Sequence, residues 1–270
     1  MKKNILVGQS GGPTAVINAS LYGIIKEAAA HSEQIGSVYG MINGIEGFLS
    51  GHIMDLSKEL SDEDLELLRL TPAAYLGSCR YKLPENLDAS VYTLLFEKFE
   101  QLNIGAVFYI GGNDSMDTAD KLSRWAAHNN KEISFIGVPK TIDNDIFGTD
   151  VTFGFHTAVD IATDALDRLH TTANSHSRIL LCEIMGNKAG WLTLSAGIAG
   201  GADIILIPEI PYDIDKVCKS VQKRSESGKN FSIVAVAEGC FDKEEAKMKK
   251  KERTRLRQEA GITTATNRIA

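Results

Sequence analysis

The segment between Pro139 and Asp145 carries the side chains with the most distinctive chemistry in the sequence. It reads Pro-Lys-Thr-Ile-Asp-Asn-Asp, so two carboxylates, Asp143 and Asp145, follow closely after Lys140 and Thr141. Magnesium-assisted phosphoryl transfer needs a carboxylate that accepts a hydroxyl proton, a second one near the metal, and a cation on the migrating phosphate. Asx turns are the alternative explanation of such a run. The combination favours phosphoryl transfer over turn chemistry.

Two glycine-rich segments could hold the phosphates for such a reaction. The first, Gly8–Asn18, follows an apolar run and is expected to open a helix. Its pair Gly11 and Gly12 lets the backbone approach an anion closely, and the amides at a helix start are donors with a favourable dipole. The segment lacks the spacings of a Walker A or dinucleotide-binding motif. A glycine-rich turn that binds nothing is the alternative.

The second glycine-rich segment, Gly111–Ser115, also lies between an apolar run and an expected helix. Its glycine amides can face a phosphate, and the Asp114 side chain can hold Mg²⁺. Ordinary helix capping by Asn113, Asp114 or Ser115 is the competing interpretation. The three segments together support a phosphate site more strongly than any one of them.

Short apolar runs alternate with helix-like segments along most of the chain, as in βαβ units of a doubly wound parallel sheet. We predict an α/β fold with ligands at the carboxyl ends of the strands, where the three segments above begin. The expected strands are Ile5–Val7, Ala106–Ile110, Ile133–Val138, Ile179–Cys182, Ile204–Ile207 and Ile233–Val236. The expected helices are Ala15–Ala30, Val91–Leu102, Ser115–His128, His156–Leu169, Trp191–Ala199 and Ile214–Ser227.

Composition narrows the class of protein. The chain has 270 residues, of which 43% are hydrophobic and 24% charged, which is typical of a folded globular protein and not of a coiled coil or a disordered chain. Its net charge of −6 provides no basic field for nucleic acid or an anionic membrane, so any anion site must be local. The apolar start stops at Gly8, and the four scattered cysteines show no zinc spacing. We therefore expect a cytoplasmic protein with buried, reduced thiols, no membrane span and no nucleic-acid partner.

A strongly basic run, Lys249–Arg257, lies within the charged segment Asp242–Glu259. A solvated helix is the simpler interpretation, and a basic arm that contacts an anion or a neighbouring subunit is the alternative.

The order of these motifs resembles that of the phosphofructokinase family, and the resemblance covers nearly the whole chain. The Thr141–Asp145 core, Thr-Ile-Asp-Asn-Asp, is its most specific part. The matching landmarks are Gly11-Gly12, Leu76-Gly-Ser-Cys-Arg80, Gly111-Gly-Asn-Asp-Ser115, Pro139–Asp145, Ser175-His-Ser-Arg178, Met185-Gly186 and Pro208-Glu209. The resemblance implies two phosphofructokinase-like α/β lobes of three layers: a donor-binding lobe over residues 1–138, a sugar-phosphate-binding lobe over 139–240, and a charged helical segment over 241–270.

Two positions bear on the phosphoryl donor. Family members that use ATP typically have glycine at the positions of Asp114 and Lys140, whereas members that use pyrophosphate have aspartate and lysine, as here. The Asp114 carboxylate would repel the α-phosphate of ATP, and Lys140 would supply a point charge to a compact donor. The resemblance therefore implies a reversible, magnesium-dependent transfer from pyrophosphate to the C1 hydroxyl of fructose 6-phosphate in glycolysis. ATP as donor is the alternative, and sedoheptulose 7-phosphate is a second possible acceptor.

The resemblance also implies a role for each matching residue. Asp143 would be the base, Asp145 would lie near Mg²⁺ or the reacting oxygens, and Thr141 would bind the moving phosphoryl group. In the donor site the matching residues are Gly11, Gly12, Arg80, Gly112 and Lys140, with Asp114 and Asn113 at the metal; in the sugar site they are Met185, Gly186 and Glu238. Arg178 matches an arginine that reaches the sugar phosphate across a subunit interface, which implies a homodimer or homotetramer.

The sequence departs from the family pattern at three places. Asn113 and Asn187 stand where many relatives have aspartate and arginine, respectively. The family also normally continues past Ala270 with an arginine- and glycine-rich segment that completes the sugar-phosphate site. The chain is therefore expected to be a fragment or a reduced member, and a non-catalytic subunit that binds sugar phosphates is a further alternative.

Overall fold

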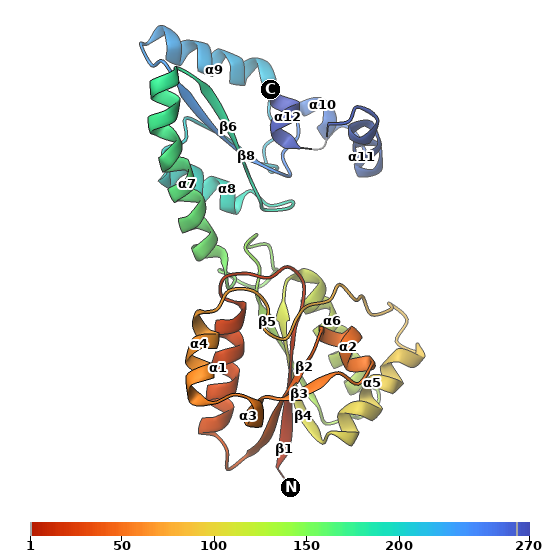
Figure 1. Ribbon diagram of the computed structural model, residues 1–270. Helices are drawn as coiled ribbons and strands as arrows, with labels where there is room; N and C mark the ends of the chain where they lie inside the picture. The colour runs from red at the N-terminus through yellow and green to blue at the C-terminus, as the bar shows by residue number, and fades with distance from the viewer. Residues whose placement is uncertain (1, 263) are drawn as a thin grey trace. The chain divides into compact units, whose positions relative to one another are not determined.

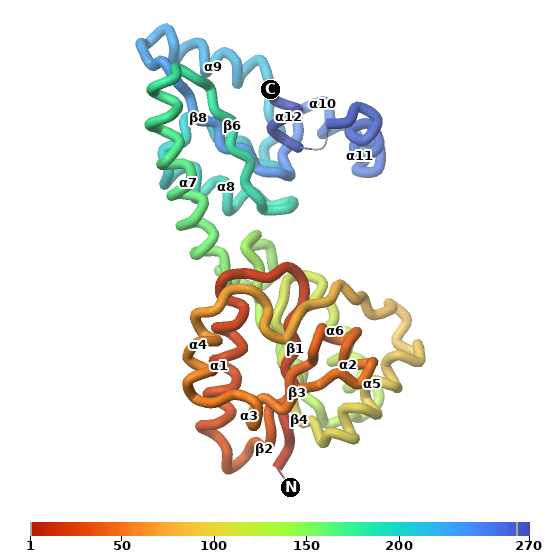
Figure 2. Tube along the Cα trace, in the orientation of Figure 1, coloured from red at the N-terminus to blue at the C-terminus, as the bar shows by residue number. Residues whose placement is uncertain are grey.

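The computed structural model describes residues 2–262 and 264–270, which form two compact units (Figure 1). The first unit comprises Met1–Thr141 and Ile146–Gly154, and the second comprises Ile142–Asp145 and Phe155–Ala270. Figure 2 follows the trace from the first unit, in red and yellow, to the second, in green and blue. The chain passes between the units only within residues 141–155, which is also where the Pro139–Asp145 motif lies.

The first unit is built on a five-stranded sheet in the order β3-β2-β1-β4-β5. Strand β1 pairs in parallel with β2 and β4, β4 pairs in parallel with β5, and only β3 is antiparallel, to β2. The central strands are continuous apolar runs because both faces of the sheet are covered. Their bounds are β1 Lys3–Gln9, β2 Ile35–Met41, β3 Ile53–Asp55, β4 Ile104–Gly111 and β5 Ser134–Pro139.

Helices cover both faces of this sheet, and a separate hydrophobic core lies between the helices and the sheet on each face. Ile5 and Val7 of β1 pack on one face against α1 (Ile17–Ala30) and α4 (Asp62–Leu70), with the short α3 (Leu56–Glu59) beside them. Leu6 points to the opposite face, because successive strand residues alternate, and joins α2 (Gly44–Leu49), α5 (Ser90–Gln101) and α6 (Asn113–His128).

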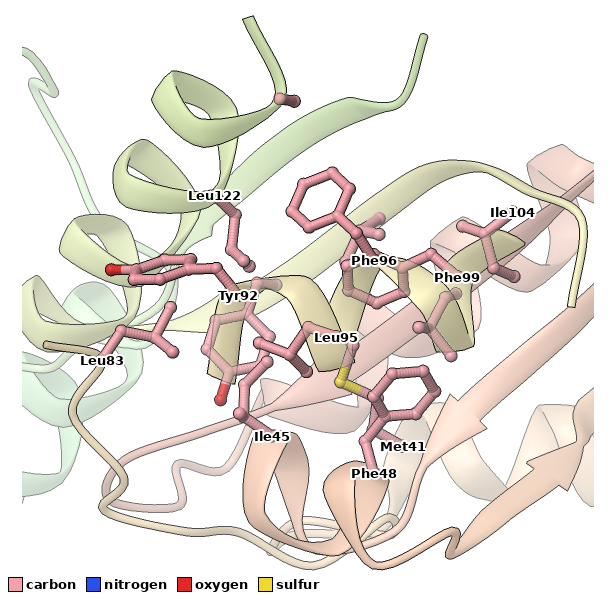
Figure 3. Packing of buried hydrophobic residues seen from close by; sticks show 14 residues of the cluster. Met41, Ile45, Phe48, Leu83, Tyr92, Leu95, Phe96, Phe99, Ile104 and Leu122 are labelled. Atoms are coloured by element: carbon pink, nitrogen blue, oxygen red, sulfur yellow. The ribbon is translucent and has the colours of Figure 1, made fainter. Parts of the chain in front are cut away.

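Aromatic side chains dominate the second of these cores, shown in Figure 3. Phe99 lies at the centre of the cluster, where it stacks on Phe48 and meets Phe96 edge-on, with both pairs of ring centroids 5.3 Å apart. All three rings are at most 2% exposed. Such rings bury a large apolar area and prefer these stacked or edge-on geometries, so they anchor α5 under the sheet.

The second unit has a parallel sheet of three strands in the order β6-β8-β7, with bounds β6 Ile179–Ile184, β7 Ile204–Leu206 and β8 Ser232–Ala237. Every residue of β8 is buried. Ile233 and Ala235 face α7 (Phe155–His176) and α8 (Trp191–Ala199), whereas Val234 and Val236 face a second core. The predicted fold class, two doubly wound α/β lobes, is therefore confirmed.

In the last thirty residues, the described part of the chain forms three short helices, α10 Lys243–Ala246, α11 Lys250–Glu259 and α12 Ala265–Ile269. The segment is not solvated throughout. Arg257 donates two hydrogen bonds to Glu245, at 2.8 and 2.9 Å. The Thr266 amide donates to Glu183 of β6 at 2.9 Å, and Ala265 is buried in the core beneath β8. The Arg257–Glu245 pair thus joins α11 to α10, and the contacts of Ala265 and Thr266 hold α12 against the rest of the second unit.

Several elements differ from the sequence-based expectation. Strands β2 and β3 were not predicted, because Gly36, Ser37 and Gly40 interrupt the apolar run of β2 and β3 has only three residues. Cys218 is exposed instead of buried, since α9 (Ile214–Glu226) has no buried residue. Helix α7 extends to His176, well beyond the expected Leu169. In the described residues, no helix combines the length and the apolar character that crossing a membrane requires.

Candidate functional site

The carboxyl ends of three neighbouring strands bring the two glycine segments and the Pro139–Thr141 part of the third motif together in the first unit. Strand β4 lies between β1 and β5, so the glycine segments after β1 and β4 and the segment after β5 end at the same edge. The amide of Ser10 donates to the carbonyl of Ile110, and the amide of Lys140 donates to the carbonyl of Gly111, each at 2.9 Å. These hydrogen bonds extend the strand pairing into the loops and fix the two glycine segments and Lys140 side by side.

A fourth segment, Leu76–Arg80, supports the first glycine loop. Gly11 has φ +75°, a conformation that favours glycine, and its carbonyl accepts a hydrogen bond from Ser78 Oγ at 2.5 Å. Its amide donates to the carbonyl of Cys79 at 3.3 Å. Arg80, the residue predicted in this segment, is exposed, whereas Ser78, which was not predicted, holds the loop. The only signal for Ser78 was its place within the Leu-Gly-Ser-Cys-Arg landmark.

Lys140 reaches from the end of β5 into the first glycine loop. Its ammonium donates a hydrogen bond to the carbonyl oxygen of Gly12, and the residue is only 2% exposed. A Cβ placed on Gly11 would lie 3.8 Å from Lys140 Nζ, so both loop glycines lie around this cation. Helix α1 begins only at Ile17, with Val16 as its N-cap, so the loop is separated from the helix start that was expected to follow it directly.

The second glycine loop leads into α6 without the capping that was the competing interpretation. Gly112 is the N-cap residue, and no side chain caps the helix, so the Asx and serine side chains are not used in that way. Asn113 and Asp114 are both exposed. A Cβ on Gly112 would lie 3.9 Å from both the Lys140 carbonyl oxygen and Thr141 Cβ, which places Gly112 against the third segment.

Asp114 forms an ion pair with Lys82, with 2.9 Å between Oδ1 and Nζ. Both side chains are 71% exposed, so the ion pair contributes little to the stability of the fold. The Lys82 ammonium does, however, partly offset the negative charge of the Asp114 carboxylate. Lys82 was not among the predicted site residues, and its place two residues after Arg80 was compatible with an ordinary surface cluster. Within the described ranges, no group of three or more His, Cys, Asp or Glu residues is placed to hold a metal ion by itself.

The loop that carries Lys82 is tied to α6 by a buried lysine. Lys121 is 2% exposed; its Nζ lies 2.7 Å from Asp117 and 2.5 Å from Glu85, and it donates to the Leu83 carbonyl at 3.2 Å. Hydrogen bonds to Asp117 and Glu85 raise the pKa of Lys121, so it stays charged. Lys121 thereby joins the segment after Lys82 to the helix that carries Asp114.

The third segment is a tight turn. Thr141 accepts a hydrogen bond from Thr152 Oγ1 on its carbonyl at 2.7 Å, and Asn144 has φ +54°. Asp143 and Asp145 belong to the stretch Ile142–Asp145 that is grouped with the second unit. Asp145 Oδ1 is buried and has no hydrogen-bond partner within the described residues. A buried acceptor without a partner is costly, so this oxygen is suited to a ligand.

In the second unit, the predicted sugar-site residues lie at the carboxyl ends of β6 and β8. Glu238 Oε1 accepts hydrogen bonds from the amides of Gly186 and Asn187, at 3.0 and 2.6 Å. Gly186 has φ +151°, and a Cβ there would lie 2.6 Å from the Ala189 carbonyl oxygen, so the turn requires glycine. Met185 is 61% exposed just before it. The carboxylate thus shapes the turn after β6; a structural role in a turn was the alternative to the sugar-site role that the resemblance implies for Glu238.

Glu209 has the same effect on the neighbouring turn. Its Oε1 accepts a hydrogen bond from the Gly190 amide at 2.7 Å, immediately before α8 begins at Trp191. The Pro208-Glu209 landmark therefore fixes the approach to α8, whose N-cap is Gly190.

Arg178 lies at the other end of the sheet. It directly precedes β6, whereas Met185 directly follows it, so the two are separated by the whole strand of six residues, about 20 Å. The side chain of Arg178 is exposed. The structure therefore does not bring Arg178 to the Gly186 turn of the same chain.

Comparison with known proteins identifies the family to which these loops belong. The family model for phosphofructokinase matches residues 4–269. The chain belongs to the phosphofructokinase family. It is 43% identical to an ATP-dependent 6-phosphofructokinase of Spirochaeta thermophila over 249 residues, which cover 89% of this chain and 65% of the relative.

Two solved structures of the family share the fold. A pyrophosphate-dependent phosphofructokinase of Nitrosospira multiformis matches with a TM-score of 0.81 at 36% identity, covering 90% of this chain and 62% of that one. Another from Marinobacter aquaeolei matches with a TM-score of 0.80 at 38% identity, covering 89% and 61%. This phosphofructokinase-family chain thus spans somewhat less than two thirds of these relatives, whose names include both phosphoryl donors.

Proposed function

We propose that this chain carries the donor and sugar loops of a magnesium-dependent phosphofructokinase that moves a phosphoryl group from pyrophosphate to the C1 hydroxyl of fructose 6-phosphate. The single observation that carries the proposal is the buried Lys140 ammonium, which lies within the Gly11-Gly12 loop. The reaction would be reversible and would serve glycolysis in the cytoplasm.

The choice of pyrophosphate rests on charge and space at the glycine loops. Lys140 offers a fixed cation beside backbone groups that can approach a phosphate, as a small and highly charged donor requires. Asp114 adds a carboxylate at the start of α6, where it would repel the α-phosphate of ATP. The names of the Nitrosospira and Marinobacter structures support this choice.

ATP is the second candidate donor, because the Spirochaeta relative, at 43% identity, is named ATP-dependent. In that case, the Asp114 carboxylate would have to be accommodated beside the nucleotide. Its ion pair with Lys82 partly offsets its charge, which is the feature of this chain most favourable to ATP.

The proposed roles follow the loops. Asp143 accepts the proton of the C1 hydroxyl, Thr141 hydrogen-bonds the moving phosphoryl group, and Lys140 stabilises its charge. The amides of Gly11, Gly12 and Gly112, together with the Arg80 side chain, bind the donor phosphates.

The proposed sugar site is the Met185-Gly186 turn, which Glu238 holds in shape through two amides. Since Arg178 lies at the far end of β6, we assign it to the sugar phosphate of a partner subunit in a homodimer or homotetramer.

The residues present fit a magnesium ion only together with substrate phosphates, which is how Mg²⁺ is usually bound in such enzymes. Asp114 and Asn113 offer carboxylate and amide oxygens at the donor loop of the first unit. In the second unit, Asp145 Oδ1 is a buried acceptor without a partner in the described residues, and we assign it to the ion or to the reacting oxygens. When bound, the ion would neutralise charge on the transferred phosphoryl group.

The proposal is tested by assaying the chain with fructose 6-phosphate and Mg²⁺ and with either pyrophosphate or ATP. Turnover with pyrophosphate and little with ATP is expected. Turnover with ATP and little with pyrophosphate would show that ATP is the phosphoryl donor. Binding of fructose 6-phosphate without turnover would indicate a non-catalytic subunit.

A further inference from the structure

A cavity of about 500 Å³ opens in the second unit at the carboxyl ends of its strands. Its walls are the loops after β6, β7 and β8 and one face of α11. Helix α11 lies beside α10 in Figure 1. The side chains that give the cavity its character are Lys188, Glu209, Phe241, Lys250, Arg253 and Arg257.

The basic run found in the sequence forms one wall of this cavity. Lys250, Arg253 and Arg257 follow one another at the spacing of one helix face, so they line the same side of α11. Lys188 approaches from the opposite wall, in the loop after β6. Arg255, on a different face of the same helix, pairs with Glu259 instead, with 3.6 Å between the charged atoms.

Most of the positive charge in the cavity is not neutralised. Arg257 is held by Glu245 through two hydrogen bonds. In the described part of the chain, no ion pair joins Lys188, Lys250 or Arg253 to a carboxylate. The carboxylate on the wall, Glu209, has one oxygen engaged by the Gly190 amide. An excess of cations is therefore gathered in a concave site of a protein whose net charge is −6.

Arg253 is also preorganised. Its guanidinium lies 4.3 Å from the centroid of the Phe241 ring, and the residue is half-buried. A guanidinium stacked on a ring keeps its in-plane N–H groups available, and that planar fork matches the geometry of a phosphate. Burial against the ring also limits the entropy lost when an anion binds.

We propose that this cavity is a binding site for a phosphoryl dianion, held by Arg253 and Lys250 from α11 and by Lys188 from the opposite loop. The site does not depend on the identity of the phosphoryl donor or on turnover. The phosphate could belong to a sugar phosphate or be inorganic, and both present the same dianion to the three cations.

The test is isothermal titration calorimetry of the 270-residue chain at low ionic strength with inorganic phosphate, fructose 6-phosphate and fructose. The two phosphates should bind, fructose should not, and binding should weaken as salt is added. Tighter binding of fructose 6-phosphate than of phosphate that is lost in Arg253→Gln would identify a sugar phosphate as the ligand of this cavity, and equal affinities would identify free phosphate.

The decisive variants are Arg253→Gln and Lys188→Gln, which lie on opposite walls. Each should weaken phosphate binding by about tenfold or more, since a charge-assisted hydrogen bond is lost. Arg255→Gln is the matched control on another face of α11 and should bind phosphate as the unchanged chain does. Lys140→Met is added to the unchanged chain and to each variant. It removes the contribution of phosphate that binds at the Gly11-Gly12 loop of the first unit.

Two results would overturn the proposal. One is phosphate affinity that is unaltered in both Arg253→Gln and Lys188→Gln, with each variant folded by circular dichroism. The other is an equal loss in Arg255→Gln, which would indicate only a general effect of charge on α11. Neither result depends on whether the chain catalyses phosphoryl transfer.

Discussion

The Lys140 ammonium donates a hydrogen bond to the carbonyl oxygen of Gly12, a residue 128 positions earlier in the chain. The bond joins the loop after β5 to the loop after β1 across the end of β4. It also places a cation that is almost fully buried among backbone groups that can approach a phosphate. The charge at the donor loops is therefore a built-in feature of the first unit.

Lys140→Met should lower pyrophosphate-dependent kcat by about 10²- to 10³-fold, the usual loss when a preorganised electrostatic contact to the transition state is removed. Methionine keeps the apolar length of the side chain but loses the hydrogen bond to Gly12, so unchanged thermal unfolding is required before the loss is assigned to the charge. Steady-state kinetics with both substrates measures the effect, and Lys131→Met, at a half-exposed lysine paired with Glu100, is the control. Unaltered kinetics would remove Lys140 from the donor site.

The double substitution Asp114→Gly with Lys140→Gly should shift the donor preference toward ATP. It removes a carboxylate that repels the α-phosphate and a cation that favours a small donor. The measurement is the ratio of kcat/KM for the two donors, compared with each single variant because neighbouring changes need not be additive. A ratio that stays the same would show that other residues select the donor.

Asp143→Ala should reduce turnover by about 10²- to 10⁴-fold with little effect on substrate affinity, because a general base acts mainly in the transition state. Asp120→Ala, an exposed aspartate paired with Arg124, should leave turnover unchanged. Full turnover in Asp143→Ala would assign the base to another residue.

Glu238→Ala should destabilise the second unit by about 1 to 3 kcal/mol, since the amides of Gly186 and Asn187 lose their shared acceptor. Because the same turn forms the proposed sugar site, KM for fructose 6-phosphate should also rise. Urea unfolding and kinetics test the two effects. Glu238→Gln retains an acceptor oxygen and should lose less on both measures; an equal loss would show that the charge alone is required.

The second unit should lose stability at alkaline pH. Burial raises the pKa of the Cys240 thiol to about 11, whereas an unfolded thiol titrates near about 8.5. The unfolded state therefore releases its proton first, so the contribution is fully present below about pH 8.5 and is lost as the pH rises toward 11. The Cys240 thiol can lower the free energy of unfolding by at most about 1.4 kcal/mol for each pH unit in this range.

Urea unfolding between pH 8 and 11 measures this effect, and Cys240→Ala should flatten the slope. Cys218→Ala, at an exposed cysteine on α9, is the matched control and should not alter it. Burial also raises the pKa of Tyr212, to about 12, so some alkaline slope should remain in Cys240→Ala. A slope identical in both variants would exclude Cys240 as its source.

The strands that could be predicted were those whose own residue types show that they are buried in a sheet. Strands β1, β4 and β8 each contain a continuous apolar run because both faces of the sheet are covered, and that pattern is visible without a structure. Strand β2 could not be recognised from the sequence, because its glycines interrupt the apolar pattern. These glycines are required by side chains that are distant in sequence but adjacent in space. A Cβ on Gly40 would lie 2.6 Å from the Leu76 side chain, a contact that no local pattern announces.

The sequence by itself determined the fold class and the three loops, because glycine pairs, apolar runs and the Thr-Ile-Asp-Asn-Asp motif are local features. Only the tertiary structure decided what the charged side chains touch. Lys140 lies against Gly12, Asp114 pairs with Lys82, and Glu238 holds the turn at Gly186. The physical reason is that hydrogen bonds and ion pairs act over a few ångströms in space, and sheet topology, unlike sequence spacing, brings distant residues that close.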